Sequence, residues 1–297
     1  MLLLFVVPIV QKEVTAQQVI DNEILSKNNN GGNNSNVNGF VEKPQVHVSI
    51  EGTEMDDKIR GGDGNDIISG EEGDDILQGN EGDDEIDGGE GEDTIDGGDG
   101  NDELKGGDDN DDIDGGKGED TIDGGDGNDE LKGGDDNDDI DGGKGEDTIE
   151  GGDGDDELKG GDDNDDIDGG DGDDELKGEE GDDNLQGNEG DDMIDGGDGD
   201  DVIDGGDGDD ELKGGKGADR FVCDKGDKII DYNSLENDKI IGQCKYEDKG
   251  LIPEPVVPDK EISKPIPEKN PLFSNSAIPP STTGNSNDDN NNFEKDI

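Results

Sequence analysis

Apolar residues are scarce in this sequence. Only 23% of its 297 residues are apolar, and tryptophan is absent. Soluble globular chains usually contain about 45–50% apolar residues. Because so little apolar surface cannot offset the entropy lost on folding, the composition excludes an ordinary enzyme built around one large core.

Positive charge is also scarce. The chain has 23 Lys and Arg residues against 90 Asp and Glu residues, which gives a net charge of −67. The phosphates of a nucleic acid or of an anionic lipid surface would repel such a chain, so neither is expected as a partner. The composition indicates a chain that needs cations.

Catalytic motifs are missing from the sequence as well. A zinc-protease HExxH site needs two histidines and the chain has one, and neither a GxSxG motif nor a GxxxxGK[ST] phosphate loop occurs. Paired carboxylates are abundant, but a general acid needs an apolar pocket that raises its pKa. We therefore predict that the protein is not an enzyme.

Proline is confined to the ends of the chain, with none between Gln45 and Ile252. Residues 1–10 form the longest apolar run, which is too short for a bilayer because a spanning helix needs about 20 residues. Residues 1–16 resemble a signal peptide cleaved after Ala16, although no Lys or Arg precedes the apolar run. A plain apolar terminus or a misassigned start codon is the alternative.

Polar segments flank the central region. Residues 17–44 are rich in Asn and Gly and are expected to form a disordered linker. Residues 248–297 are rich in Pro and then in Asn, and a disordered tail is expected there. In residues 45–60, apolar and polar side chains alternate around Val48 and Ile50, which predicts a first strand followed by a degenerate repeat.

A nine-residue repeat fills the region in between. Residues 61–222 read as 18 consecutive nonapeptides, such as GGDGNDIIS and GGDGNDELK, and the degenerate unit GTEMDDKIR precedes them at residues 52–60. Position 1 is Gly and position 6 is Asp in every unit, and position 8 is Ile or Leu except at Phe221. Such a period indicates a stacked repeat architecture.

The spacing predicts a coil of short strands and turns. Position 8 is flanked by polar residues, so a strand over positions 7 to 9 points one side chain inward, and the glycines of positions 1 to 6 suit turns. Two nonapeptides would complete one winding, and successive windings would stack as parallel strands about 4.8 Å apart. One aliphatic side chain of about 1.5–3 kcal/mol every nine residues cannot offset about 1–2 kcal/mol of backbone entropy per residue.

Stacking would place the position-6 Asp of each winding above that of the next. Unscreened carboxylates at that spacing repel each other, whereas a cation between them reverses the interaction. Ca²⁺ accepts about six to eight oxygen ligands in flexible geometry, Mg²⁺ demands a tighter octahedron, and Zn²⁺ prefers nitrogen and sulfur. The pattern therefore predicts calcium as the cation.

The repeat strongly resembles the GGxGxDxUx unit of the RTX (repeats-in-toxin) haemolysin-type calcium-binding family. The resemblance implies an all-β fold, a right-handed parallel β-roll or β-helix-like solenoid, whose turns bind Ca²⁺ through backbone carbonyls and position-6 carboxylates. The two edges of such a roll would hold at most about 17 ions. The implied ligands are Asp57, Asp66, Asp75, Asp84, Asp93, Asp102, Asp111, Asp120, Asp129, Asp138, Asp147, Asp156, Asp165, Asp174, Asp183, Asp192, Asp201, Asp210 and Asp219.

Residues 217–242 resemble the segment that closes RTX rolls, and we assign residues 223–247 to a C-terminal cap. A disulfide between Cys223 and Cys244 would clamp this cap in an exported protein, and a pair of free thiols is the alternative. Apolar residues of this region are expected to supply the buried area that the repeats lack: Phe221, Ile229, Ile230, Tyr232, Leu235, Ile240 and Ile241.

Together these patterns predict a secreted or cell-surface protein that binds calcium and folds as the ions bind. The alternative is an extracellular structural or adhesive spacer that binds a surface or a protein partner in a calcium-dependent way. A disordered acidic calcium buffer is a third possibility, which the aliphatic residue in every repeat argues against. The export route, Sec-like or type I, stays open.

The signal-peptide prediction has a direct test. N-terminal sequencing of the exported protein is expected to begin at Gln17, the residue after the predicted cleavage site. Exported chains that still begin at Met1 would contradict the prediction.

Overall fold

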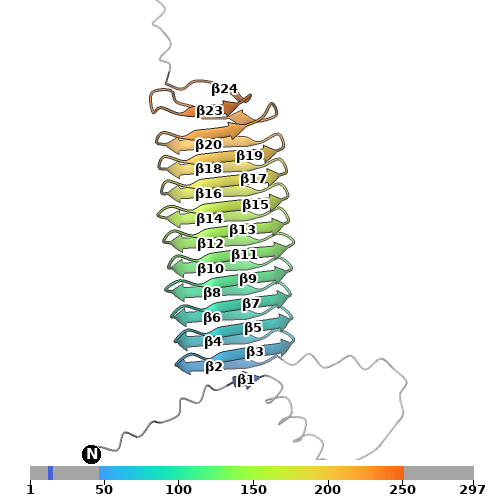
Figure 1. The fold of residues 1–297 in the computed structure, drawn as a ribbon. Helices are drawn as coiled ribbons and strands as arrows, with labels where there is room; N and C mark the ends of the chain where they lie inside the picture. The colour runs from blue at the N-terminus through green and yellow to red at the C-terminus, as the bar shows by residue number, and fades with distance from the viewer. Residues whose placement is uncertain (1–12, 16–46, 251–297) are drawn as a thin grey trace, which may run out of the picture. The chain divides into compact units, whose positions relative to one another are not determined.

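The computed structural model describes residues 13–15 and 47–250; the predicted linker, nearly all of the predicted tail and the rest of the predicted signal peptide lie outside the described residues. The described residues form two parallel β-sheets of 12 strands each, and successive strands belong to alternate sheets (Figure 1). No helix that could cross a bilayer occurs in this part of the chain.

We call the two sheets the odd sheet and the even sheet, after the numbers of their strands. The odd sheet contains β1 (Glu13–Thr15), β3 (Lys58–Asp63), β5 (Ile76–Glu81), β7 (Thr94–Asp99), β9 (Asp112–Lys117), β11 (Glu130–Asp135), β13 (Thr148–Asp153), β15 (Asp166–Asp171), β17 (Asn184–Glu189), β19 (Val202–Asp207), β21 (Arg220–Cys223) and β23 (Lys239–Gly242). The even sheet contains β2 (Ser49–Glu54), β4 (Ile67–Glu72), β6 (Glu85–Glu90), β8 (Glu103–Asp108), β10 (Thr121–Asp126), β12 (Asp139–Lys144), β14 (Glu157–Asp162), β16 (Glu175–Glu180), β18 (Met193–Asp198), β20 (Glu211–Lys216), β22 (Lys228–Ile229) and β24 (Lys245–Tyr246).

Each strand pairs in parallel with the next strand of its own sheet. Ile122 of β10 lies opposite Ile140 of β12, and Leu131 of β11 lies opposite Ile149 of β13. Both pairings join residues 18 apart, so two nonapeptides complete one winding. The predicted all-β parallel solenoid is confirmed.

The strands are longer than the three residues predicted. β10 spans six residues, which are positions 7 to 9 of one repeat and positions 1 to 3 of the next. The prediction that positions 1 to 3 belong to the turn was therefore wrong. Position 1 requires glycine because there is no room for a side chain, and not because of a turn. A Cβ on Gly133 would lie 2.2 Å from Oδ2 of Asp138 and 2.7 Å from the carbonyl oxygen of Gly151.

A single stack of aliphatic side chains fills the space between the two sheets. Position 8 supplies one side chain per repeat from Ile59 to Leu212, each at most 2% exposed, and Phe221 follows them. The residues on either side of position 8 are exposed or half-buried. Each winding therefore buries only two large apolar side chains, which is the thin core that the repeat predicted.

Tight turns at positions 4 to 6 connect the strands. Asp109, Asp136 and Asp163 replace glycine at position 4, and their φ angles are 78°, 77° and 80°. Asp is among the residues that tolerate this left-handed conformation, so the substitutions leave the turn intact.

The first described winding begins with β2. This strand starts at Ser49, inside residues 45–60 where the sequence predicts a first strand, and Ile50 enters the core. His47 precedes the strand, and its Nδ1 lies 2.8 Å from the carbonyl oxygen of Asn65.

β1 lies inside the predicted signal peptide and pairs with β3. Val14 is opposite Ile59, so β1 takes the place of one further strand at this end of the odd sheet. Cleavage after Ala16, which would remove β1, stays a prediction.

The cap continues both sheets. Ile229 of β22 lies opposite Leu212, and Ile240 of β23 lies opposite Phe221. These pairings place the cap strands in the register of the repeats, so the solenoid runs past Val222, where the last nonapeptide ends.

The apolar residues of the cap are less buried than predicted. Ile229 is buried, and Tyr232 and Ile240 pack against the core while remaining partly exposed. Leu235 and Ile241 are 72% and 47% exposed, so the prediction was wrong for these two residues. Leu235 lies in the turn between β22 and β23, and Ile241 follows the inward-facing Ile240, so neither reaches the core.

The predicted disulfide joins Cys223 to Cys244, whose Cα atoms are 5.8 Å apart. Cys223 is buried at the end of the core, and Cys244 packs against it. The bridge therefore ties the segment between β23 and β24 to the end of β21.

Loss of this bridge is expected to loosen the cap. Closing a loop of this length contributes about 3 kcal/mol, so the Cys223→Ser/Cys244→Ser variant should lose about that much stability in the cap. The two tyrosines of the chain, Tyr232 and Tyr246, lie in the cap with ring centroids 4.9 Å apart, so tyrosine fluorescence during urea unfolding reports on this part alone. Oxidised wild-type protein is the control, and an unchanged midpoint would contradict the expectation.

Candidate metal centre

Two rows of aspartates follow the two turn edges of the roll. Position 6 of every repeat contributes one Asp, and all nineteen from Asp57 to Asp219 are 1–8% exposed. Each residue stands directly before a strand and two residues before the aliphatic side chain of the core. The structure thus buries every residue of the ligand set that the sequence predicted.

One oxygen of these carboxylates accepts a hydrogen bond from the backbone of the preceding winding. The backbone N–H of Asp57 donates to Oδ1 of Asp75 at 2.6 Å, and that of Asp120 donates to Oδ1 of Asp138 at 2.8 Å. The same contact recurs between residues 18 apart up to Asp201, which donates to Asp219 at 3.2 Å. The aspartates therefore form a continuous ladder that links neighbouring windings at their turns.

The other oxygen of these carboxylates, Oδ2, is buried without a hydrogen-bond partner in the described part of the chain. This holds for the following residues of the rows: Asp66, Asp75, Asp84, Asp93, Asp102, Asp111, Asp120, Asp129, Asp138, Asp147, Asp156, Asp165, Asp174, Asp183, Asp192, Asp201 and Asp210. Buried polar groups nearly always have a partner in folded proteins. A row of buried carboxylate oxygens without a hydrogen-bond donor therefore indicates that another group, such as a bound ion, pairs with them.

These Oδ2 atoms face a backbone carbonyl across a small space. A Cβ on Gly79 would lie 2.2 Å from Oδ2 of Asp84 and 2.5 Å from the carbonyl oxygen of Gly97. A Cβ on Gly88 would meet Oδ2 of Asp93 and the carbonyl oxygen of Gly106 in the same way. The glycine at position 1 thus leaves a cradle in which the two nearest atoms are a carboxylate oxygen and a carbonyl oxygen.

Burial perturbs the carboxyl groups of the rows. Desolvation, with neighbouring carboxylates adding to it, raises the pKa of Asp84, Asp138 and Asp165 to about 7, and that of Asp75 and Asp93 to about 6. The hydrogen bond from the backbone N–H works against the rise but does not cancel it. Without cations the rows would therefore take up protons near neutral pH.

Charge, burial and donor type together fit a hard divalent cation. The cradle offers carboxylate and carbonyl oxygens, which are the ligands that Ca²⁺ prefers. The described residues contain no group of three or more His, Cys, Asp or Glu side chains that converge on one point. Such a group is not needed here, because each turn supplies one carboxylate and the backbone supplies the remaining oxygens.

The first row member differs from the others. Oδ2 of Asp57 accepts a hydrogen bond from the Thr53 hydroxyl at 2.8 Å, so the oxygen that is orphaned elsewhere is satisfied here. The sequence had singled out this repeat because Thr53 stands where Gly is usual.

Two further aspartates, Asp227 and Asp238, extend the rows into the cap, and the sequence reasoning missed them. Their Oδ1 atoms accept from the N–H of Asp210 at 3.4 Å and of Asp219 at 3.3 Å. Their Oδ2 atoms accept backbone N–H groups of the cap at 2.6 Å. The signal was present in the sequence, since each is followed by Lys and Ile in the spacing of positions 6 to 8.

A second, exposed ladder at position 5 was also missed. Oδ1 of Asp155 accepts the N–H of Asp173 at 3.0 Å, and Oδ1 of Asp173 accepts that of Asp191 at 2.8 Å. These bonds run in the opposite direction to those of the buried rows. Asn137 fills the same role with its amide oxygen, so this ladder needs an acceptor rather than a charge.

Comparison with known proteins agrees with this geometry. The family model described as RTX calcium-binding nonapeptide repeat (4 copies) matches residues 51–86, 87–122, 114–149, 141–176, 168–203, 177–212 and 195–227. Among curated proteins, no relative matches the chain. A solved hyperactive, Ca²⁺-dependent, beta-helical antifreeze protein from an Antarctic bacterium has 22% identity, covering 71% of this chain and 82% of that chain, with a TM-score of 0.32. A likeness at that level supports no conclusion about fold or function.

The raised pKa values predict an unusual response to acid. A carboxyl group whose pKa is near 3.8 unfolded and about 6–7 in the roll favours the roll below pH 4, and this contribution is lost as the pH rises through 7. In excess chelator, β-sheet content by circular dichroism should therefore increase between about pH 8 and about pH 5. β content that stays flat or falls over this range would contradict the expectation.

Proposed function

Because the chain belongs to the RTX calcium-binding nonapeptide repeat family, we propose that it is a non-enzymatic, secreted or cell-surface protein that folds by binding calcium. The observation that carries the proposal is the two rows of buried carboxylate oxygens, seventeen in all, without a partner. Most of them, such as those of Asp84 and Asp93, lie beside a backbone carbonyl in a cradle that only glycine leaves open.

The energetics support coupled folding and binding. Two aliphatic side chains per winding are too few to hold the chain folded, and the buried carboxylates oppose folding when they are charged. An ion between a carboxylate and a carbonyl removes that penalty and joins two windings. Binding free energy is then folding free energy, as in other proteins whose sites do not exist in the unfolded chain.

The proposed ligands are the Oδ2 atoms of the aspartates from Asp66 to Asp210, together with the facing glycine carbonyls. One ion for each orphaned oxygen corresponds to at most about 17 ions, whose charge would offset about half of the net charge of −67. Asp57 and Asp219, the first and last of the position-6 aspartates, are not among these residues, and their part in binding stays a prediction.

An extracellular setting suits this chemistry. Calcium modules outside cells work with dissociation constants of about 10⁻⁴–10⁻³ M, so the chain would stay unfolded in the cell and fold after export. The disulfide of the cap also belongs to an oxidising compartment. Export through the signal peptide predicted at residues 1–16 is part of this proposal.

A structural or adhesive role is the second candidate. The outward positions of both sheets form regular rows of charged side chains along the solenoid, and such a surface could contact a partner only after calcium has folded it. This role adds a partner to calcium binding and does not replace it.

The test is a calcium titration followed by circular dichroism. Wild-type protein in chelator near neutral pH should lack β structure and gain it cooperatively as calcium is added. The variant Asp84→Asn/Asp120→Asn/Asp156→Asn/Asp192→Asn keeps the Oδ1 acceptor but removes the charge at Oδ2 on one edge. Its folding midpoint should move to at least about tenfold more calcium.

The matched control changes the preceding residue of the same four turns. Asp83→Asn/Glu119→Gln/Asp155→Asn/Asp191→Asn removes the same number of charges from exposed side chains and should leave the midpoint within about twofold of wild type. Equal midpoints for the two variants, or a β-rich spectrum of wild-type protein in excess chelator at neutral pH, would contradict the proposed function.

A further inference from the structure

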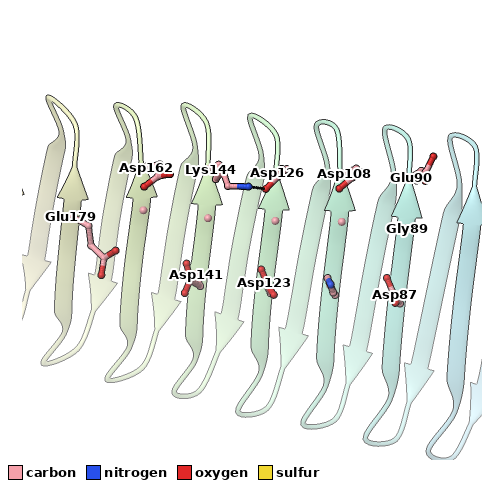
Figure 2. A pocket seen from close by; sticks show the side chains of 15 residues that line it. Asp87, Gly89, Glu90, Asp108, Asp123, Asp126, Asp141, Lys144, Asp162 and Glu179 are labelled. Atoms are coloured by element: carbon pink, nitrogen blue, oxygen red, sulfur yellow. Dashed lines mark hydrogen bonds and ion pairs between the residues drawn. The ribbon is translucent and has the colours of Figure 1, made fainter.

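A groove with a glycine floor crosses the even sheet. Position 2 of consecutive even strands is Gly107, Gly125 and Gly143, which lie opposite one another in register. Because these residues have no side chain, the surface is hollowed between the side chains of positions 9 and 3, and the hollow has a volume of about 620 Å³. Figure 2 shows the two rows of side chains on either side of the glycine positions.

Both ends of the groove are closed by glutamates at position 2. Glu71 lies opposite the first floor glycine, Gly89, and Glu179 lies opposite the last, Gly161. Both glutamates have positive φ, 82° and 79°, so they keep the backbone of the glycines that they replace. Six strand spacings of about 4.8 Å separate them, so the groove is about 29 Å long between its ends.

The odd sheet repeats the arrangement. Its floor includes Gly116 and Gly134, the hollow has a volume of about 540 Å³, and Asn80 and Asn188 close the ends at position 2. Two faces of one solenoid thus have grooves of the same construction and the same length.

The walls of the grooves are strongly acidic. Eight carboxylates and two lysines line the even-sheet groove, and six carboxylates and two lysines line the odd-sheet groove. Within the described residues, Asp87, Asp108 and Asp162 have no cationic side chain at ion-pair distance. An occupant of this surface must therefore supply positive charge along its length.

The chain's own lysines indicate how a cation would be held. The ammonium group of Lys144 contacts Oδ1 of Asp126 on the wall of the even-sheet groove (Figure 2). In the odd-sheet groove, Lys117 contacts Asp99, and Lys132 lies 3.7 Å from Glu150. Ammonium groups already pair with the wall carboxylates, and carboxylates beyond these pairs stay exposed to solvent.

We propose that each glycine-floored groove binds an extended cationic peptide segment, rich in Lys or Arg, that lies across the strands. At about 3.3 Å per residue, a segment of about nine residues spans the distance between the end residues. The glycine floor lets the peptide backbone sink between the walls, while its side chains reach the carboxylates on both sides. The inference rests on the proposed function, because the grooves exist only in the folded roll.

The test uses full-length protein at saturating calcium and a fluorescent oligolysine of about nine residues, with binding followed by fluorescence anisotropy. The floor variant is Gly107→Asn/Gly143→Asn/Gly116→Asn/Gly152→Asn, which adds side chains to both grooves without changing the net charge. At the present φ of 102–129° a Cβ on these glycines would lie 2.1–2.3 Å from a carbonyl oxygen of the neighbouring strand, so the backbone must shift to admit it. The protein already has Asn at this position with φ of 85° and 78°, at Asn80 and Asn188. We expect this variant to bind at least about tenfold more weakly than wild type.

The matched control places the same substitution outside the grooves, at four other position-2 glycines. Gly62→Asn/Gly197→Asn/Gly206→Asn/Gly215→Asn should bind within about twofold of wild type. If the floor variant also binds like wild type, the attraction is diffuse and the inference fails.

A second pair of variants does not depend on filling the floor. Asp87→Asn/Asp108→Asn removes two wall charges of the even-sheet groove, and Glu85→Gln/Glu103→Gln removes two charges from position 7 of the same strands, β6 and β8. The wall variant should weaken binding about threefold more than its control. Equal loss in both would overturn the inference.

Circular dichroism of the same samples separates the two proposals. Wild-type protein that stays unfolded in calcium would contradict the proposed function and, because the grooves exist only in the folded roll, the groove with it. Folded variants that bind oligolysine equally would contradict the groove alone.

Discussion

The fold depends on buried carboxylates that approach one another along two edges. From Asp66 to Asp219 each position-6 Asp uses one oxygen to hold the backbone of the winding before it, and in all of these except Asp219 the second oxygen is buried without a hydrogen-bond partner in the described residues. Such a row opposes folding when it is charged, as the raised pKa values of Asp84 and Asp138 reflect. Under the proposed function, cations bound by the rows would supply much of the folding free energy.

The buried carboxylates also explain why glycine occupies position 1 of each repeat. At position 1 a Cβ would occupy the space between Oδ2 and the facing carbonyl, as at Gly79, so the residue that leaves the cradle open cannot be exchanged. At position 2 the requirement is weaker, since Glu71 and Asn80 occur there with positive φ. This difference separates a glycine that keeps the space beside Oδ2 open from one that shapes the surface.

The ends of the solenoid show how the rows are terminated. Thr53 donates its hydroxyl to Asp57 at one end, and backbone N–H groups satisfy both oxygens of Asp227 and Asp238 at the other. Hydrogen bonds thus replace the partner that the orphaned oxygens lack. The repeat can therefore stop without leaving an unpaired carboxylate oxygen on Asp57, Asp227 or Asp238.

The amino-acid sequence by itself determined the period, the stacking of two nonapeptides per winding and the inward position of residues such as Ile122, because a strict repeat forces equal residues into equal environments. It also determined which aspartates line up, and it predicted calcium as their cation. Only the tertiary structure decided that Oδ1 of Asp138 is taken and Oδ2 is free, that positions 1 to 3 belong to strands, and that Asp227 and Asp238 prolong the rows. These features depend on contacts between residues about one winding apart, and the spacing within a single repeat does not specify them.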